Sequence, residues 1–229
     1  MNNTLEASTA FELWKSATVS GFDYHLTNGT GIFKIDSFEK SGLVRHCFTS
    51  RKGGVSTGCY AEMNMSWTRT ESEDITRRNY EIAAQAIGID PRDLVGVDGD
   101  PGRPVLAVNK ALQGSGLDRP GVIRYNFDAM YTDEPGVALC TIHGDCTPIF
   151  ILDTNKRAIC MCHSGWRGTL NGMPGQAVAA MLGHGSRAQD LLLAIGPAIG
   201  KCCFEAGQDV ADMFSEKYGM LDCCLLYHI

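Results

Sequence analysis

Apolar and polar positions follow two different periods along this chain. Compact apolar blocks have the length and β-branching of buried strands. They cover residues 136–142, 147–153, 157–164 and 191–200, the last running into a glycine loop. The stretch 43–50 alternates apolar and polar residues and also predicts a strand. The segment 94–108 is predicted as irregular chain that ends in a short strand.

Helical spacing of apolar residues marks three further segments. They cover 72–88, 169–182 and 205–218. The first is the best delimited, because Ser72 can cap its start and Gly88 ends the run.

The turn residues 154–156 separate two predicted strands so closely that an antiparallel hairpin is expected. Strands and helices are interleaved elsewhere. This pattern predicts an α/β fold of the mixed α+β kind, in which helices sandwich mixed β-sheets, and disfavours a purely parallel sheet.

Composition places the chain among ordinary globular proteins, with 44 % hydrophobic and 20 % charged residues. We predict a single domain over residues 1–229, with 1–40 as an N-terminal lead-in. The net charge of −6 argues against nucleic acid as a partner, because phosphate binding needs a basic surface.

No apolar run approaches the roughly 18 residues of a membrane span, and the N-terminus lacks a secretory pattern. A cytoplasmic location without a membrane partner is therefore expected.

The ten cysteines lie mostly in apolar runs. We interpret them as buried small hydrophobic residues of a reducing compartment rather than as a disulfide framework. The exception is Cys146, which lies among polar residues and glycines.

Cys146 and His163 form the first candidate site. They lie at the ends of the two hairpin strands, so antiparallel pairing brings them roughly opposite each other. On the second strand, Cys160 and Cys162 share one face, whereas His163 points to the other. Two chemistries fit the pair: ligands for zinc or copper, or a cysteine nucleophile with a histidine base.

A metal site needs a third protein ligand, and the residues alone leave several candidates. His143 is near in sequence but faces away from Cys146 unless Gly144 turns the chain. Asp98 offers a carboxylate oxygen from an irregular segment. The remaining histidines cannot be positioned from the sequence.

Arg51 and Lys52 open a glycine-rich loop, RKGGVSTG. Arginine with exposed backbone N–H groups suits a phosphate or another anion. The pattern is not a P-loop, because it lacks the spaced glycines and the Lys-Ser/Thr ending, and an ordinary surface loop is an equal alternative.

Several segments together resemble the laccase-domain family, also called the polyphenol oxidase or YfiH-like family. They are TSRKGGVSTG, YAEMNMS, RRN, GDCTPIFILD, CHSGWRG and AIGPAIGKCCFEAG, which occur in the family's order within about residues 40–218. The resemblance implies a mixed α/β sandwich shared with the deamidase domain of cytotoxic necrotizing factor toxins. It also implies a zinc-dependent purine nucleoside phosphorylase with adenosine deaminase activity, although older descriptions assign copper laccases.

The family's metal ligands are two histidines and a cysteine. By resemblance, the cysteine corresponds to Cys146 and one histidine to His163, whereas Asp98 stands where the family has the other histidine. The family pattern also continues past LLYHI with a helix, a strand and an arginine-rich tail. This implies a C-terminally shortened fold with an exposed sheet edge.

The leading hypothesis is phosphorolysis of adenosine- or inosine-type nucleosides to a free base and ribose 1-phosphate. Zinc, with copper as an alternative, would be held by Cys146, His163 and Asp98. Catalytic roles are expected for Asp145 in proton transfer and for Arg51 and Arg167 in binding phosphate. Substrate contacts are expected from Asn64, His143 and Ser164.

Two alternatives stay open: a metal-free Cys146–His163 hydrolase, and an inactive metal-binding paralogue. Metal analysis separates them, because the hydrolase needs no zinc. Phenol oxidation is not expected, because a multicopper centre needs more clustered histidines than the six scattered ones here.

Overall fold

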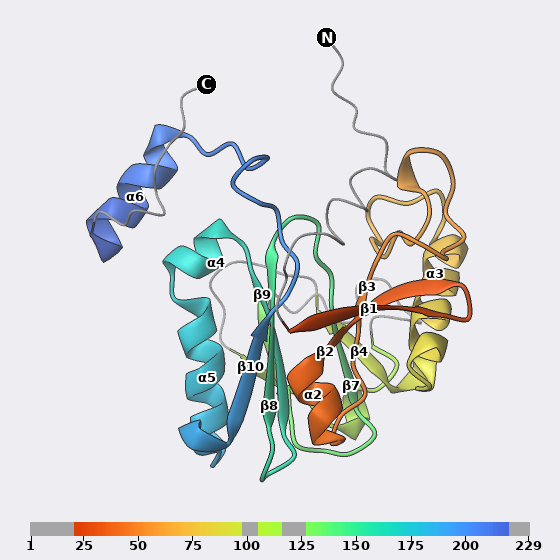
Figure 1. Ribbon diagram of the computed structural model, residues 1–229, viewed down its shortest axis with the longest axis horizontal. Coiled ribbons are helices and arrows are strands. Elements are labelled where there is room, and N and C mark those ends of the chain that lie inside the picture. The colour runs from red at the N-terminus through yellow and green to blue at the C-terminus, as the bar shows by residue number, and fades with distance from the viewer. Residues whose placement is uncertain (1–20, 98–104, 116–126, 220–229) are drawn as a thin grey trace.

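The computed structural model describes residues 21–97, 105–115 and 127–219. Its centre is a five-stranded sheet in the order β10-β8-β9-β6-β5 (Figure 1). All neighbours in this sheet are antiparallel except β5 and β6. The strands are β5 (Leu106–Ala107), β6 (Ala129–Thr132), β8 (Thr147–Asp153), β9 (Ile159–Ser164) and β10 (Leu191–Ile195).

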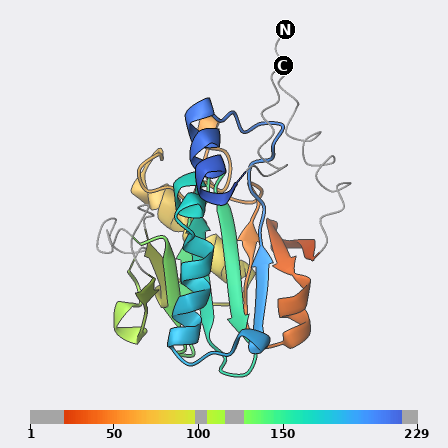
Figure 2. The ribbon, with the colours of Figure 1, turned by 90° about the vertical axis from the view of Figure 1, so that its left-hand side faces the viewer.

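One face of this sheet is covered by α5 (Met173–Gly183), with α4 (Trp166–Leu170) at its start (Figure 2). Cys160 and Cys162 of β9 pack here with Met173 and Met181, all at most 1 % exposed. The helix α6 (Gln208–Tyr218) lies beside α4, and the Tyr218 hydroxyl donates to two α4 carbonyls.

The other face carries two smaller sheets. The first is β1 (Phe22–Thr27), β2 (Thr30–Ile35) and β3 (Phe48–Thr49), with α2 (Asp36–Ser41) following β2. The second pairs β4 (Leu94–Val97) in parallel with β7 (Ala138–Thr141), and α3 (Glu73–Ala86) packs against it. The 3₁₀ turns are Gly58–Tyr60, Pro91–Asp93, Lys110–Leu112 and Ala188–Asp190. The predicted mixed α/β architecture is confirmed.

The predicted β8–β9 hairpin is confirmed, with Pro148 opposite His163. The predicted helix cap is also confirmed, because the Ser72 hydroxyl accepts from the Ile75 N–H. The helix predicted over 169–182 is instead α4 and α5, which meet at Gly172 in the left-handed region (φ 74°).

Other sequence predictions were wrong in extent. The strand predicted over 43–50 shrinks to β3, because only Phe48 and Thr49 find partners on β2. The start of 94–108 is a strand and not irregular chain, since β4 pairs with β7. The apolar pattern of the sequence did not predict β1, β2, α2 and β6.

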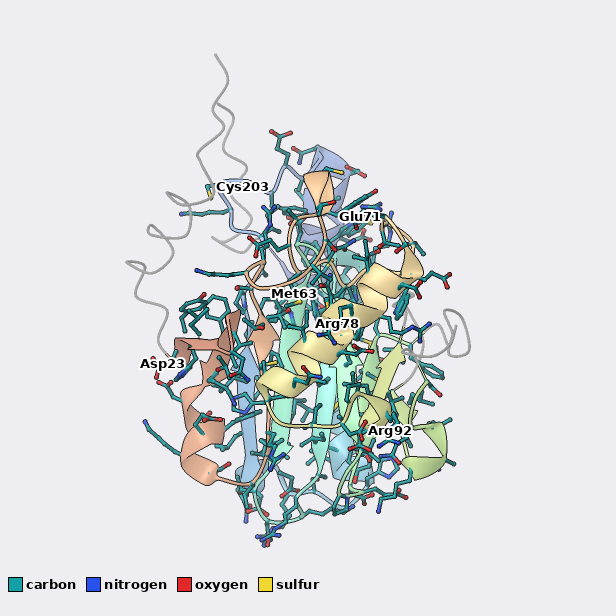
Figure 3. All side chains as sticks on the ribbon, turned by 90° about the vertical axis from the view of Figure 1, so that its right-hand side faces the viewer. Asp23, Met63, Glu71, Arg78, Arg92 and Cys203 are labelled. Atoms are coloured by element: carbon teal, nitrogen blue, oxygen red, sulfur yellow. The ribbon has the colours of Figure 1, made fainter. Side chains whose placement is uncertain are left out.

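The burial of the cysteines differs in part from the prediction. Cys160 and Cys162 are buried as expected. The expectation was wrong for Cys59, Cys202 and Cys203, which are exposed because they lie in surface turns (Cys203 in Figure 3). Cys47 and Cys140 are intermediate.

Within the described residues, no helix is both long enough and apolar enough to cross a membrane.

The hairpin turn depends on Asp153, which is 1 % exposed. Its carboxylate accepts from the N–H groups of Asn155 (2.9 Å) and Lys156 (2.8 Å). Burial by itself raises the pKa of Asp153, but the hydrogen bonds it accepts outweigh burial and lower that pKa below its usual value.

Asp153→Ala should therefore lower the free energy of unfolding by about 1–3 kcal/mol, because it removes the acceptor of two part-buried hydrogen bonds that hold the turn. Urea unfolding at pH 7 measures this. Because the folded-state pKa is depressed, the contribution is present above the unfolded pKa and disappears as the pH falls through the folded one. The same substitution at exposed Asp23 (Figure 3) is the control. Equal stability of the two variants would contradict the role of Asp153.

Candidate functional site

The open end of the β8–β9 hairpin brings Cys146 and His163 together. A side chain at Gly165 would place its Cβ 3.2 Å from Cys146 Sγ and 3.8 Å from His163 Cε1. Both side chains therefore border one small space that glycine leaves open. This juxtaposition agrees with the one predicted from the hairpin.

Asp128 fixes the His163 ring and was not among the residues predicted for the site. Its Oδ1 lies 3.1 Å from His163 Nδ1, and its carbonyl accepts from the His163 N–H at 2.7 Å. Asp128 is 2 % exposed. A carboxylate on Nδ1 leaves Nε2 available for a ligand, as in histidines that bind metals. The available signal was an acidic residue directly before the apolar strand Ala129–Thr132.

The chain turns sharply before β8. Residues 144–146 form a bend, and Asp145 has φ 87°. This φ lies in a region that non-glycine residues rarely adopt, and such strain is often found at functional sites. The Asp145 carbonyl accepts from the Ile199 N–H at 2.9 Å, which ties the bend to the loop after β10.

His143 lies beside this bend. Its ring centroid is 5.2 Å from that of His163. Nε2 lies 2.8 Å from Thr141 Oγ1, while Nδ1 is buried and has no hydrogen-bond partner. Burial, followed by the nearby His163, lowers the pKa of His143 to about 3, so its imidazole is neutral at pH 7.

The Cys146 thiol is not activated in this arrangement. Burial, followed by the charges of Asp145 and Asp128, raises its pKa above the usual value. Among the described residues, no hydrogen bond joins Cys146 to His163, whose Nδ1 is bonded to Asp128 instead. The raised pKa and the missing hydrogen bond to His163 both disfavour a thiolate nucleophile in this arrangement.

Other predicted site residues have partners within the protein. The Arg51 side chain donates twice to the Ala61 carbonyl, at 3.1 and 2.7 Å. Asn64 donates to the Arg69 carbonyl and accepts from the Ser66 N–H. Their predicted phosphate and substrate roles remain predictions.

Two predicted residues lie at the junction of β9 and α4. The Ser164 hydroxyl is buried and lies 2.8 Å from Thr169 Oγ1. Arg167 is exposed, with its guanidinium 4.1 Å from the Trp166 ring centroid. A third predicted residue, Asp98, lies outside the described residues.

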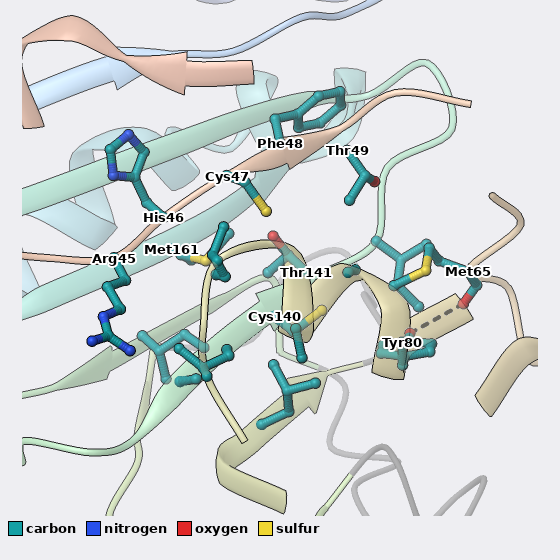
Figure 4. A pocket seen from close by; sticks show the side chains of 18 of the residues that line it. Arg45, His46, Cys47, Phe48, Thr49, Met65, Tyr80, Cys140, Thr141 and Met161 are labelled. Carbon is teal, nitrogen blue, oxygen red and sulfur yellow. Dashed lines mark hydrogen bonds between the residues drawn. The ribbon is translucent and has the colours of Figure 1, made fainter. Parts of the chain in front are cut away.

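A cavity of about 2120 Å³ lies between β3, β7 and α3. His46, Cys47, Cys140 and Thr141 are among the side chains that line it (Figure 4). The predicted residues in its wall are Arg51, Asn64 and His143. The wall does not include Cys146, Asp145, His163, Ser164 or Arg167. His143 therefore connects the cavity to the Cys146–His163 space.

Two donors suited to zinc, Cys146 Sγ and His163 Nε2, border the same space, and the buried His143 Nδ1 lies close by without a partner. These residue types fit a borderline-soft metal. As the side chains stand, no three potential ligands in the described part of the chain are grouped closely enough to hold an ion together.

Comparisons with known proteins show which proteins this chain is similar to. The family model described as "Multi-copper polyphenol oxidoreductase laccase" matches residues 45–225. A purine nucleoside phosphorylase of Bacteroides thetaiotaomicron is 28 % identical over 194 residues, which are 84 % of this chain and 72 % of that protein. Purine nucleoside phosphorylase YlmD of Geobacillus stearothermophilus is 30 % identical over 72 % of this chain. The match spans only 60 % of YlmD, less than two thirds of its length.

Adenosine deaminase RL5, from an unknown prokaryotic organism, is 27 % identical over 81 % of this chain and 71 % of that protein. Among solved structures, the hypothetical protein YfiH of Bacillus licheniformis superposes with a TM-score of 0.79 at 25 % identity. This superposition covers 87 % of this chain and 73 % of the YfiH chain.

Proposed function

Because the chain belongs to the multi-copper polyphenol oxidoreductase laccase family, we propose that it is a metal-dependent purine nucleoside phosphorylase. The observation that carries the proposal is the Cys146–His163 pair, with His163 held by buried Asp128. Phosphate replaces the purine at C1′ of an adenosine- or inosine-type nucleoside. The C1′–N9 bond breaks, a C1′–oxygen bond forms, and the base leaves with a proton.

Cys146 and His163 would hold the metal together with a third protein ligand. Zinc is the proposed ion and copper the alternative, because thiolate and imidazole suit both. When bound, it would supply a Lewis acid that stabilises negative charge on an oxygen. Asp128 keeps the His163 ring oriented, so that only Nε2 is presented to the site.

The remaining side chains would bind and orient the substrates. Asp145, exposed beside Cys146, is assigned to proton transfer at the leaving base. Arg51 and Arg167 are assigned to phosphate. Asn64 and Ser164 are assigned to the nucleoside, and the cavity behind His143 offers an apolar region that can receive a purine.

Deamination of adenosine at the same site is a second activity, favoured by the similarity to adenosine deaminase RL5. One experiment tests both. Purified protein, with its metal content measured first, is incubated with adenosine or inosine, with and without phosphate. Phosphate-dependent release of the base supports phosphorolysis. Phosphate-independent conversion of adenosine to inosine supports deamination, and bound metal without either product supports an inactive paralogue.

Arg51→Ala tests the phosphate assignment. If Arg51 binds phosphate, the apparent KM for phosphate should rise about tenfold or more, because a charge-assisted hydrogen bond contributes roughly 1.5–3 kcal/mol. The KM for the nucleoside should change much less. Steady-state kinetics in each substrate provides the measurement, and neighbouring Lys52→Ala is the control. Equal changes in both KM values would show that Arg51 only holds its loop through the Ala61 carbonyl.

A further inference from the structure

We propose that His143, and not Asp98, is the third protein ligand of the metal site formed by Cys146 and His163. This inference depends on the metal binding in the proposed function, but it does not depend on which reaction the metal serves. It assigns to His143 a role other than contact with the substrate.

The first argument is the buried, unpaired nitrogen of His143. Nδ1 is enclosed by protein and has no hydrogen-bond partner. Leaving such a group unsatisfied is unfavourable, because burial has removed its hydrogen bonds to water. A metal ion at Nδ1 would remove this cost, because a neutral imidazole nitrogen is a good zinc ligand.

The second argument is that both imidazoles are held in the same way. Asp128 occupies Nδ1 of His163 and leaves Nε2. Thr141 occupies Nε2 of His143 and leaves Nδ1. Metal-binding histidines typically have one nitrogen bonded to an outer partner, which orients the ring and leaves the other for the ion.

The third argument is the separation of the two rings. Their centroids lie 5.2 Å apart. Two imidazoles that share a tetrahedral zinc, each at the usual Zn–N distance, have centroids about 5 Å apart. The spacing between the rings is therefore compatible with a shared ion once the ring nitrogens turn toward it.

The backbone between His143 and Cys146 bends sharply before β8. The bend at 144–146 and the positive φ of Asp145 interrupt the strand between His143 and Cys146, so strict alternation of their side chains is not required there. The three side chains do not yet form a complete ligand group. The proposal therefore includes rotation of these side chains when the ion binds.

The expected donor set has one charged sulfur and two neutral nitrogens. With Asp98 as the third ligand, the set would carry two negative charges. The neutral imidazole leaves the bound dication more electrophilic and favours zinc, cobalt or copper over harder cations.

The test is direct metal titration of the purified full chain after its metal has been removed. Zn²⁺ affinity is measured by calorimetry, and Co²⁺ binding by the visible absorption of a tetrahedral thiolate site. We compare His143→Ala and His143→Gln with Asp98→Ala, and use His25→Ala on β1 as the matched control. Circular dichroism and thermal unfolding show whether each variant is folded.

His143→Ala and His143→Gln should each weaken Zn²⁺ binding by about 100-fold or more, because loss of an outer partner alone costs 10–100-fold. They should also change the Co²⁺ spectrum. Asp98→Ala and His25→Ala should bind almost as the wild type does. Weakened binding in Asp98→Ala with unchanged binding in folded His143→Gln would overturn the proposal, as would unchanged binding in every variant.

Failure of the proposed function would give a different experimental result from failure of the ligand assignment. If the wild type binds Zn²⁺ with the expected dependence on His143 but turns over no nucleoside, the ligand assignment holds and the phosphorylase proposal does not.

Discussion

Replacing His163 with alanine should abolish both metal retention and nucleoside cleavage. The ring presents Nε2 to the site and is fixed through Nδ1 by buried Asp128, so one side chain serves binding and activity together. The substitution also leaves the Asp128 carboxylate without its imidazole partner in a buried position. We expect less than one hundredth of the wild-type Zn²⁺ affinity, and cleavage at the level of the no-enzyme control.

Metal content by atomic absorption and base release by chromatography provide the two measurements. His184→Ala is the control, because His184 stacks on Tyr131 at the opposite end of the sheet and lies away from the site. Near-normal activity of folded His163→Ala would locate the chemistry elsewhere in the protein.

The second large effect is expected at Gly165. Its φ of −71° and ψ of 176° suit any residue, so a substitution there acts through space and not through backbone strain. A Cβ would meet Cys146 Sγ at 3.2 Å, closer than ordinary packing, and would lie 3.8 Å from His163 Cε1. Gly165→Val therefore places a branched side chain between the two proposed ligands.

We expect Gly165→Val to lower kcat/KM for nucleoside cleavage by about 100-fold, since a displacement of about 1 Å in an active site can have that effect. Zn²⁺ affinity should fall as well. Gly144→Ala is the matched control, because a Cβ at Gly144 meets no atom within 4 Å. Activity of Gly165→Val equal to that of Gly144→Ala would show that the space at Gly165 is not part of the site.

The cysteines show where sequence reasoning is reliable. Alternation along β9 correctly placed Cys160 and Cys162 on the buried face and His163 on the opposite one, because side-chain direction in a strand depends only on position. Burial of Cys202 and Cys203 was predicted from their residue type and was wrong. Whether a loop is covered depends on what packs over it, which residue type does not encode.

Local pattern also determined the hairpin, and with it the first two site residues. Turn residues between two apolar strands specify antiparallel pairing, so Cys146 and His163 were brought together from the sequence alone. The helix α3 was predicted for a similar reason, since its cap and its apolar spacing both lie within one segment.

Tertiary structure decided the contacts between residues far apart in the chain. Asp128 meets His163 because β6 pairs with β9, and the short β6 carries too little local pattern to be recognised. Thr141 and His143 reach the site because β7 pairs with β4 and the chain then bends at the positive φ of Asp145. Gly144 allowed a bend there, but the sequence did not specify one. The sequence by itself thus determined the hairpin and the meeting of Cys146 and His163 at its open end. The partners that orient this chemistry depend on strand pairing and packing, which are set by the whole fold.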